Sequence, residues 1–112
     1  MLFRSIYEQR VYRAMPGRLP KLLARLESDT LPLWEKHGIR PVGFFTTLVG
    51  ESASDLTYLL AWESFEEREA RWGAFQADPE WKAKRADSEK DGPLVANISN
   101  TLLSPTSFSL LK

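Results

Sequence analysis

The sequence contains no cysteine and a single histidine, His37, in 112 residues. Without cysteine there is neither a disulfide framework nor a thiolate metal site. One histidine excludes a three-histidine metal centre within one chain, and any Ser-His-Asp relay would have to use His37. The sequence therefore predicts no metal site.

Unbalanced charge and long apolar runs are also missing. The 15 acidic and 15 basic residues cancel, which argues against a nucleic-acid groove or an anionic membrane surface as partner. No apolar run approaches the roughly 20 residues that cross a bilayer, and the first ten residues lack the apolar core of a signal peptide. None of the scattered glycines precedes a Lys-Ser/Thr pair, so a phosphate-binding loop is absent. We expect one soluble, cytoplasmic domain over residues 1–104, followed by a tail over 105–112.

The spacing of apolar residues divides the chain into strands and helices. Alternation with a period of two is typical of strands, and spacings of three and four residues are typical of helices. Strands are predicted at about 3–13, 39–49, 56–63 and 94–103, and helices at about 20–37, 64–77 and 78–90.

Proline and cap residues indicate where the helices begin and end. Gly38 can adopt the left-handed conformation that commonly ends a helix. Pro32 falls inside the first helical pattern, and we expect it to kink or restart the helix. The other predicted boundaries are the Ser64–Glu67 capping box and the Asp78 cap followed by Pro79.

The element order βαββαβ predicts an α+β, ferredoxin-like fold with an antiparallel four-stranded sheet. Right-handed crossovers place the first and third strands in the centre and all helices on one face. The other face would then expose aromatic side chains to water, and apolar patches of that size usually mark an interface. The simplest cover is a second copy related by a two-fold axis, which gives a dimeric α+β barrel.

Three polar-headed side chains lie on one face of the first strand. Glu8, Arg10 and Tyr12 share this face because alternate residues of a strand point the same way. They either form an exposed ion pair worth under about 1 kcal/mol, or line an enclosed space where a low dielectric strengthens the pairing. The sheet geometry favours the enclosed interpretation, with the pair at the wall of the barrel.

Seven segments that together span most of the chain are Tyr7–Tyr12, Pro16–Pro20, Leu31–Ile39, Val42–Thr47, Trp62–Arg68, Asp78–Trp81 and Leu102–Thr106. Together these segments resemble the NIPSNAP family. The resemblance implies a dimeric α+β barrel, in a fold group that includes cofactor-free monooxygenases, isomerases, haem-binding enzymes and proteins of unknown role. One departure is that relatives often carry His-Leu-Trp where this chain has Tyr58-Leu59-Leu60, so Tyr58 must replace that histidine or the activity is absent.

The resemblance leads to two hypotheses about function. In the first, a homodimer binds a small, partly aromatic or carbonyl-bearing molecule, between sheet and helices or within the barrel. Any catalysis would be proton transfer or oxygenation without a cofactor, as in a monooxygenase or isomerase. His37 or Glu8 would act as the base, while Arg10 and Tyr58 would stabilise an oxyanion. The expected ligand contacts are Tyr7, Tyr12, Arg40, Phe44 and Trp62.

The second hypothesis is a non-catalytic dimeric module that engages another protein. Each singled-out residue also has a structural interpretation: His37 can cap a helix end, Arg40 can be a solvated surface residue, and the tyrosines can be packing residues. Whether the protein is an enzyme stays open at this point. A space above roughly 300 Å³ that receives a titratable group would favour the first hypothesis.

Overall fold

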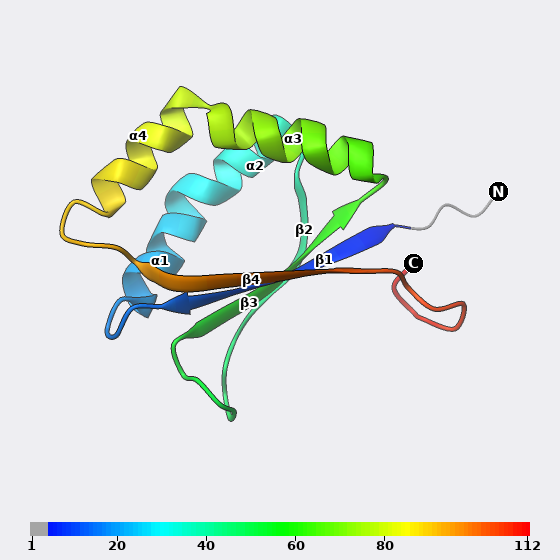
Figure 1. The fold of residues 1–112 in the computed structure, drawn as a ribbon, viewed down its shortest axis with the longest axis horizontal. Coiled ribbons are helices and arrows are strands. Elements are labelled where there is room, and N and C mark those ends of the chain that lie inside the picture. The colour runs from blue at the N-terminus through cyan, green and yellow to red at the C-terminus, as the bar shows by residue number, and fades with distance from the viewer. Residues whose placement is uncertain (1–4) are drawn as a thin grey trace.

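The computed structural model describes residues 5–112 and contains one four-stranded sheet (Figure 1). All neighbouring strands are antiparallel and their order is β2-β3-β1-β4, which confirms the predicted central strands. The start of the predicted first strand, residues 3–4, lies outside the described residues. The strands are β1 (Ile6–Ala14), β2 (Arg40–Thr46), β3 (Asp55–Trp62) and β4 (Val95–Leu103).

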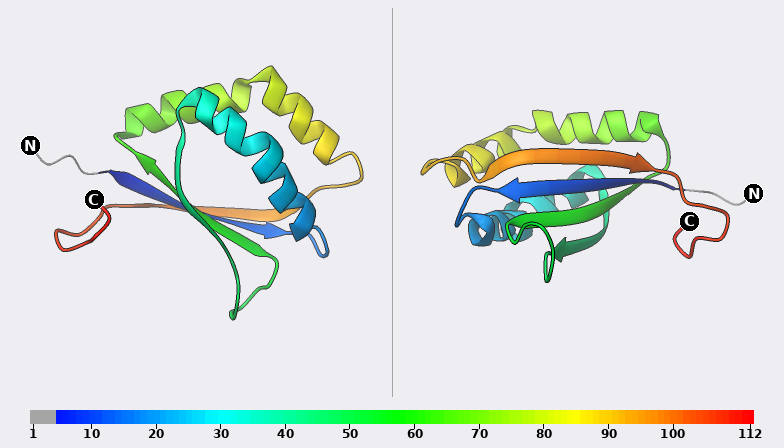
Figure 2. Two further views of the ribbon diagram at one scale, coloured as in Figure 1. Left: turned by 180° about the vertical axis from the view of Figure 1, so that it is seen from behind. Right: turned by 60° about the horizontal axis from the view of Figure 1, so that its bottom comes forward.

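The helices form a single layer on one face of the sheet (Figures 1 and 2), as predicted. The fold is therefore α+β, with the main core between the sheet and the helices. None of the described helices is long and apolar enough to cross a membrane. The helical segments are α1 (Leu19–Arg25), the π-helical turn η1 (Leu26–Thr30), α2 (Leu31–His37), α3 (Phe65–Ala77) and α4 (Pro79–Ser88).

A π-helical turn resolves the conflict between Pro32 and the helical pattern around it. The Leu31 N–H donates to the Leu26 carbonyl, five residues back, and Thr30 and Leu31 keep right-handed helical dihedrals. A proline inside an α-helix lacks an N–H and its ring collides with the preceding turn, so a wider turn accommodates it. Instead of restarting, the helix continues to Gly38, which ends it in the predicted left-handed conformation at φ 71°.

The start of α3 and the start of α4 are capped as predicted. The Ser64 hydroxyl accepts the Glu67 N–H at 3.0 Å. The Glu67 carboxylate reaches back to the N–H of Glu63 at 2.9 Å, one residue before the usual partner in a capping box. Asp78 Oδ1 accepts the Glu80 N–H at 2.8 Å and so caps α4. Because Asp78 also ends α3, the chain turns sharply there, which brings α4 over the β4 side of the sheet (Figure 1).

The two phenylalanines of β2 point to opposite faces of the sheet. Phe44 faces the helices and lies against Trp34, with ring centroids 6.1 Å apart, and against Tyr58 at 5.5 Å. Phe45 faces the other way and is 57% exposed. It shares the helix-free face with Val11, because both pair with Thr57 in the sheet register.

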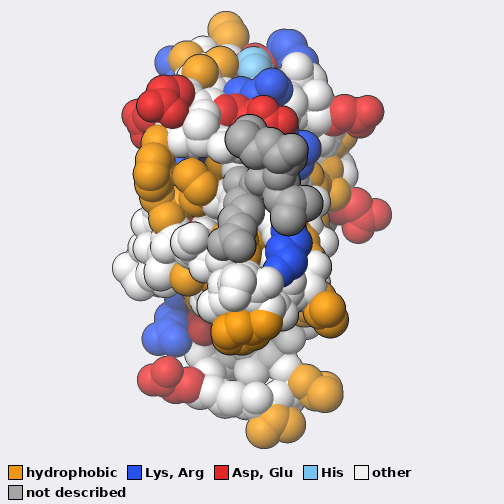
Figure 3. All heavy atoms as spheres, turned by 90° about the vertical axis from the view of Figure 1, so that its right-hand side faces the viewer, with side chains coloured by type: hydrophobic (Ala, Val, Ile, Leu, Met, Phe, Trp, Pro, Cys, Tyr) orange, Lys and Arg blue, Asp and Glu red, His pale blue; other side chains and the backbone are white. Residues whose placement is uncertain are grey.

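The C-terminal tail contacts the helix-free face at the start of β1. The Tyr7 hydroxyl donates to the main-chain oxygen of Lys112 at 2.9 Å, so the tail curls back beside the start of β1 (Figure 2). Away from that end the face stays open. The loop between β2 and β3 adds Leu48 and Val49, which are 97% and 93% exposed. In the end-on view of Figure 3, charged side chains gather around the helical layer, and hydrophobic side chains are scattered from that layer to the opposite end, near this loop.

Candidate functional site

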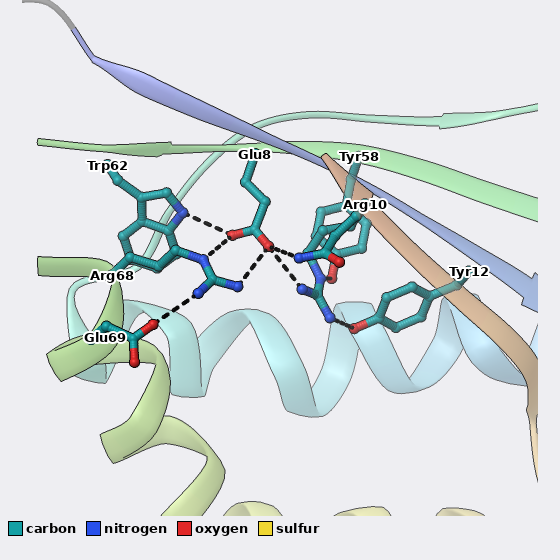
Figure 4. A network of polar contacts seen from close by, with 8 residues as sticks. Glu8, Arg10, Tyr12, Tyr58, Trp62, Arg68 and Glu69 are labelled. Atoms are coloured by element: carbon teal, nitrogen blue, oxygen red, sulfur yellow. Dashed lines mark hydrogen bonds and ion pairs between the residues drawn. The ribbon is translucent and has the colours of Figure 1, made fainter. Parts of the chain in front are cut away.

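Glu8 is the centre of a buried polar network between β1 and α3 (Figure 4). Its side chain has no exposed surface. Arg68 of α3 holds both carboxylate oxygens, Nε at 2.9 Å from Oε1 and Nη2 at 3.0 Å from Oε2. Arg10 Nη1 donates to Oε2 at 2.9 Å. The sequence pattern predicted the Glu8–Arg10 pair but gave no indication of Arg68, which is 60 residues away in the chain.

Two neutral donors complete the environment of the Glu8 carboxylate. Trp62 Nε1 donates to Oε1 and Asn100 Nδ2 to Oε2, each at 3.0 Å. Burial alone would raise the pKa of Glu8, but the hydrogen bonds from Arg68, Asn100, Trp62 and Arg10 together lower this pKa to about 2. Glu8 is therefore ionised at neutral pH, and its oxygen lone pairs are already occupied.

Arg10 connects the Glu8 network to two tyrosines. Its Nε donates to the Tyr58 hydroxyl at 2.9 Å and its Nη2 to the Tyr12 hydroxyl at 3.2 Å. The guanidinium also lies 4.5 Å from the centre of the Trp72 ring, a cation–π geometry. Although burial disfavours its charge, Tyr12, Tyr58 and Glu8 raise the pKa of Arg10 above its ordinary value. For Tyr58, in contrast, burial itself raises the pKa, and the side chain stays a neutral phenol.

The network lies under the helices, not on the helix-free face. Glu8, Arg10 and Tyr12 pair across the sheet with Leu60, Tyr58 and Leu56, all of which are buried in the core. The expectation that Glu8 and Arg10 line the wall of a barrel between two sheets was therefore wrong. The prediction that they are enclosed was correct, because Arg68 and the helical layer shut them from solvent.

A groove of about 370 Å³ opens beside this network, between α4 and the inner face of β4. Arg10 and Tyr12 form its β1 side, so Arg10 belongs both to the network and to the groove wall. The volume lies at the lower end of the range for small-molecule sites, roughly 300–1,000 Å³. Its other walls include Arg25 of α1, Trp81 and Arg85 of α4, and Val95 and Ile98 of β4.

Two arginines of the groove share one carboxylate, and neither is well paired with it. Arg25 Nη1 lies 3.6 Å from Glu89 Oε1, and Arg85 Nε lies 3.7 Å from Glu89 Oε2. Arg25 also donates to the Ser88 hydroxyl at 3.2 Å. Burial lowers the pKa of Arg25, and Glu89 offsets this effect only in part. The groove therefore contains a buried guanidinium whose charge is incompletely compensated.

A cavity of about 30 Å³ lies next to the groove and shares Tyr12, Arg25 and Trp81 with it. Trp34 lines the cavity as well. The indole N–H groups of Trp34 and Trp81 are buried, and neither has a hydrogen-bond acceptor among residues 5–112. Buried donors are normally paired, so this region offers two donors to an acceptor atom of suitable size.

His37 lies apart from the groove. Its Nε2 is 2.7 Å from Asp78 Oδ2, the oxygen that also accepts Lys36 Nζ at 2.9 Å. Lys36 and His37, together with the capping N–H of Glu80, hold the pKa of Asp78 well below its usual range. The main-chain oxygen of His37 accepts from Arg71. His37 therefore links the end of α2 to the α3–α4 corner and lines neither the groove nor the small cavity.

Of the five predicted ligand contacts, Tyr12 alone lines the groove. Trp62 has no exposed surface and donates a hydrogen bond to Glu8, whereas Phe44 is part of the core. Tyr7 points to the other face. Arg40 makes two hydrogen bonds to Glu67, at 3.0 and 3.2 Å, on the surface.

The charged groove residues that sequence reasoning missed, together with Trp81, come from α1 and from α4 with its C-terminal cap, Glu89. Trp81, Arg85 and Glu89 follow one another at four-residue intervals, a spacing that places side chains on one helix face. This signal was available in the sequence. Arg25 comes from a different helix, and no local pattern connects it to the other three.

The comparisons with known proteins agree with this fold. The NIPSNAP family model matches residues 7–110. A NIPSNAP family protein with unknown function from Agrobacterium tumefaciens is 26% identical, with a TM-score of 0.87 over 100% of this chain and 97% of that one. An uncharacterized NIPSNAP-like domain protein from Burkholderia xenovorans is also 26% identical, with a TM-score of 0.85 over 96% of this chain and 90% of that one. A second NIPSNAP family protein from Agrobacterium tumefaciens is 25% identical, with a TM-score of 0.86 over 96% of this chain and 99% of that one. No curated protein matches the chain.

Proposed function

This chain belongs to the NIPSNAP family, and on that premise we propose that it is a cytoplasmic homodimer whose subunits each bind a small organic molecule in the groove between α4 and β4. Residues 1–104 would form the domain and residues 105–112 its tail. The observation that carries the proposal is the groove itself. Its volume, about 370 Å³, exceeds the threshold of roughly 300 Å³, and it receives charged groups from three elements.

The buried network supports the binding proposal because it fixes one wall of the groove. Arg10 makes hydrogen bonds to Glu8, Tyr12 and Tyr58, so its guanidinium is held from several sides. A polar group that is already ordered before a ligand arrives loses little side-chain entropy on binding. The groove is therefore preorganised at its β1 side.

The same contacts favour binding over the catalytic roles predicted for these residues. Arg10 is the member of that set that reaches the groove, where a guanidinium suits an oxyanion. Glu8 has no free lone pair for a proton, and Tyr58 and His37 do not line the groove. We therefore propose ligand binding as the primary activity, without proton abstraction by Glu8 or His37.

The dimer half of the proposal rests on the open face of the sheet. Phe45 is 57% exposed there, and Leu103 at the end of β4 is 40% exposed. A second copy placed sheet to sheet would cover both residues and leave the helices outside. Such a dimer would leave the α4 groove, which lies on the helical side, accessible to a ligand.

Fragment screening with a blocked variant tests the binding half. Ala96 lines the groove, so Ala96→Trp would fill it, whereas Ala74→Trp adds the same side chain to an exposed position of α3. In ligand-observed NMR, fragments that bind the wild type should bind the Ala74 variant and lose binding to the Ala96 variant. Two outcomes would contradict the proposal: the fragments bind both variants, or no fragment binds the wild type or either variant. Either outcome would leave the protein-interaction module as the better hypothesis.

A matched pair of phenylalanine variants tests the dimer half. Phe45 and Phe65 are almost equally exposed, at 57% and 58%, but Phe65 lies on α3, on the helical side. Light scattering should report a monomer for Phe45→Asp and a dimer for Phe65→Asp. A dimer in both variants would place the subunit contact elsewhere.

A further inference from the structure

We infer that the groove selects a flat organic anion, with its carboxylate between Arg25 and Arg85 and its ring against Trp81. This inference deepens the proposed function and rests on it. Arg10 has its counter-charge in Glu8, but the other two guanidiniums of the groove wall, from Arg25 and Arg85, share the single carboxylate of Glu89. A ligand with one negative charge would reduce this imbalance.

The distances around Glu89 show that both arginines are only weakly paired with it. Both arginines lie within 4 Å of Glu89, but neither makes a hydrogen bond to it, since the separations are 3.6 and 3.7 Å. Good ion pairs between guanidinium and carboxylate have separations of about 2.7–2.9 Å. One carboxylate, that of Glu89, already lies within 4 Å of both guanidiniums, so the two groups are close enough for one carboxylate to contact both. Each guanidinium has five N–H donors in a fixed planar arrangement, and neither uses all of them.

Of the two arginines, Arg25 lies at the buried end of the groove and Arg85 at the end open to solvent. The Arg25 side chain is 7% exposed and the Arg85 side chain is 55% exposed. A buried cation is costly unless a counter-charge accompanies it, so Arg25 gains most from an anion. Arg85 lies at the solvent side, where it can attract an anion from solution.

Aromatic and apolar walls specify the rest of the ligand. The Arg25 guanidinium lies over the Trp81 ring, 5.5 Å from its centre, so the positive charge and the aromatic wall of the groove are in contact. Val95 and Ile98 line the opposite, β4 side. A volume of about 370 Å³ fits a small aromatic carboxylate better than a nucleotide.

Three related probes test the selectivity: benzoate, its neutral analogue benzamide, and phenyl phosphate. The readout is the indole region of a ¹H–¹⁵N NMR spectrum, with the Trp81 signal assigned through Trp81→Phe. Benzoate should move the Trp81 signal and bind at least about tenfold more tightly than benzamide, the effect expected for one charge-assisted hydrogen bond. The Trp62 signal should stay in place, because Trp62 is bound to Glu8.

Charge variants of the wall give effects of opposite sign, which a merely structural role would not produce. Arg85→Gln, at an exposed position, should weaken benzoate binding about tenfold. Glu89→Gln should strengthen it several-fold, because it removes the competing carboxylate. Arg40→Gln, a surface arginine outside the groove, is the matched control and should leave affinity unchanged.

Three results would overturn the inference. Benzamide binding as tightly as benzoate would show that charge is not recognised, and phenyl phosphate binding tenfold more tightly would replace the carboxylate with a phosphate. The third is an absent shift of Trp81 with every probe. If groove-binding fragments are nevertheless lost in Ala96→Trp, the proposed function stands and only the anion inference fails.

Discussion

Replacing Glu8 by glutamine removes the charge at the centre of the buried network while keeping its shape. In the wild type the carboxylate accepts five hydrogen bonds and counters Arg10 and Arg68. In Glu8→Gln one oxygen becomes an NH₂ group that faces donors, and two guanidiniums lose their shared counter-charge. Breaking a buried ion pair in this way costs about 3–5 kcal/mol.

The pKa of Glu8 gives a second route to the same magnitude. Folding lowers this pKa from an ordinary value of 4.5 to about 2. At about 1.4 kcal/mol per pKa unit, the ionised carboxylate stabilises the fold by roughly 3 kcal/mol at neutral pH. Because the folded-state pKa is the lower one, this contribution is complete above about pH 4.5 and is lost as the pH falls towards 2.

Urea denaturation at several pH values measures both effects. At pH 7 the wild type should exceed Glu8→Gln in unfolding free energy by about 3–5 kcal/mol, and this gap should narrow towards pH 2. Glu69→Gln is the control, because Glu69 pairs with the same Arg68 from a side chain that is 78% exposed. It should cost under about 1 kcal/mol. A gap of under 1 kcal/mol for Glu8→Gln, or one that does not change with pH, would refute the reasoning.

Other predictions concern helix ends. Gly38→Ala should lower the unfolding free energy by at least about 1 kcal/mol, since Gly38 has φ 71° and a Cβ would overlap the Arg71 guanidinium. Gly73→Ala, in an open position of α3, should instead raise it by up to about 1 kcal/mol, so equal effects would contradict this assignment. Asp78→Ala should lower the melting temperature more than Asp78→Asn. Both variants lose the ion pairs with Lys36 and His37, but asparagine keeps a side-chain oxygen that can cap α4. A larger decrease for Asp78→Asn would show that the cap does not stabilise the fold.

The fold was predictable because its signals are local. Ser64, Asp78 and Gly38 mark helix ends through their own backbone and side-chain chemistry, and the structure has each of them in that role. The alternation of residues in β2 places Phe44 and Phe45 on opposite faces of the sheet, but it does not indicate which of them faces the helices. The sequence predicted that β2 extends to Val49. In the structure β2 ends at Thr46, which pairs with Leu56 near the start of β3, so the residues after Thr46 form the loop.

The candidate site was predictable only where it follows one strand. Glu8, Arg10 and Tyr12 could be placed on one face from their spacing, but the partner that encloses them, Arg68, comes from α3. Arg10→Ala therefore leaves Glu8 paired with Arg68. The groove depends on how α4 crosses Arg25 of α1, a tertiary arrangement that no sequence spacing records.

Native mass spectrometry of the protein, purified without denaturation, tests the central claim most directly, because it reports the subunit count and bound small molecules together. The account predicts a dimer that carries up to two copies of one small molecule, both lost on denaturation and absent from Ala96→Trp. A monomer without any bound molecule would contradict it.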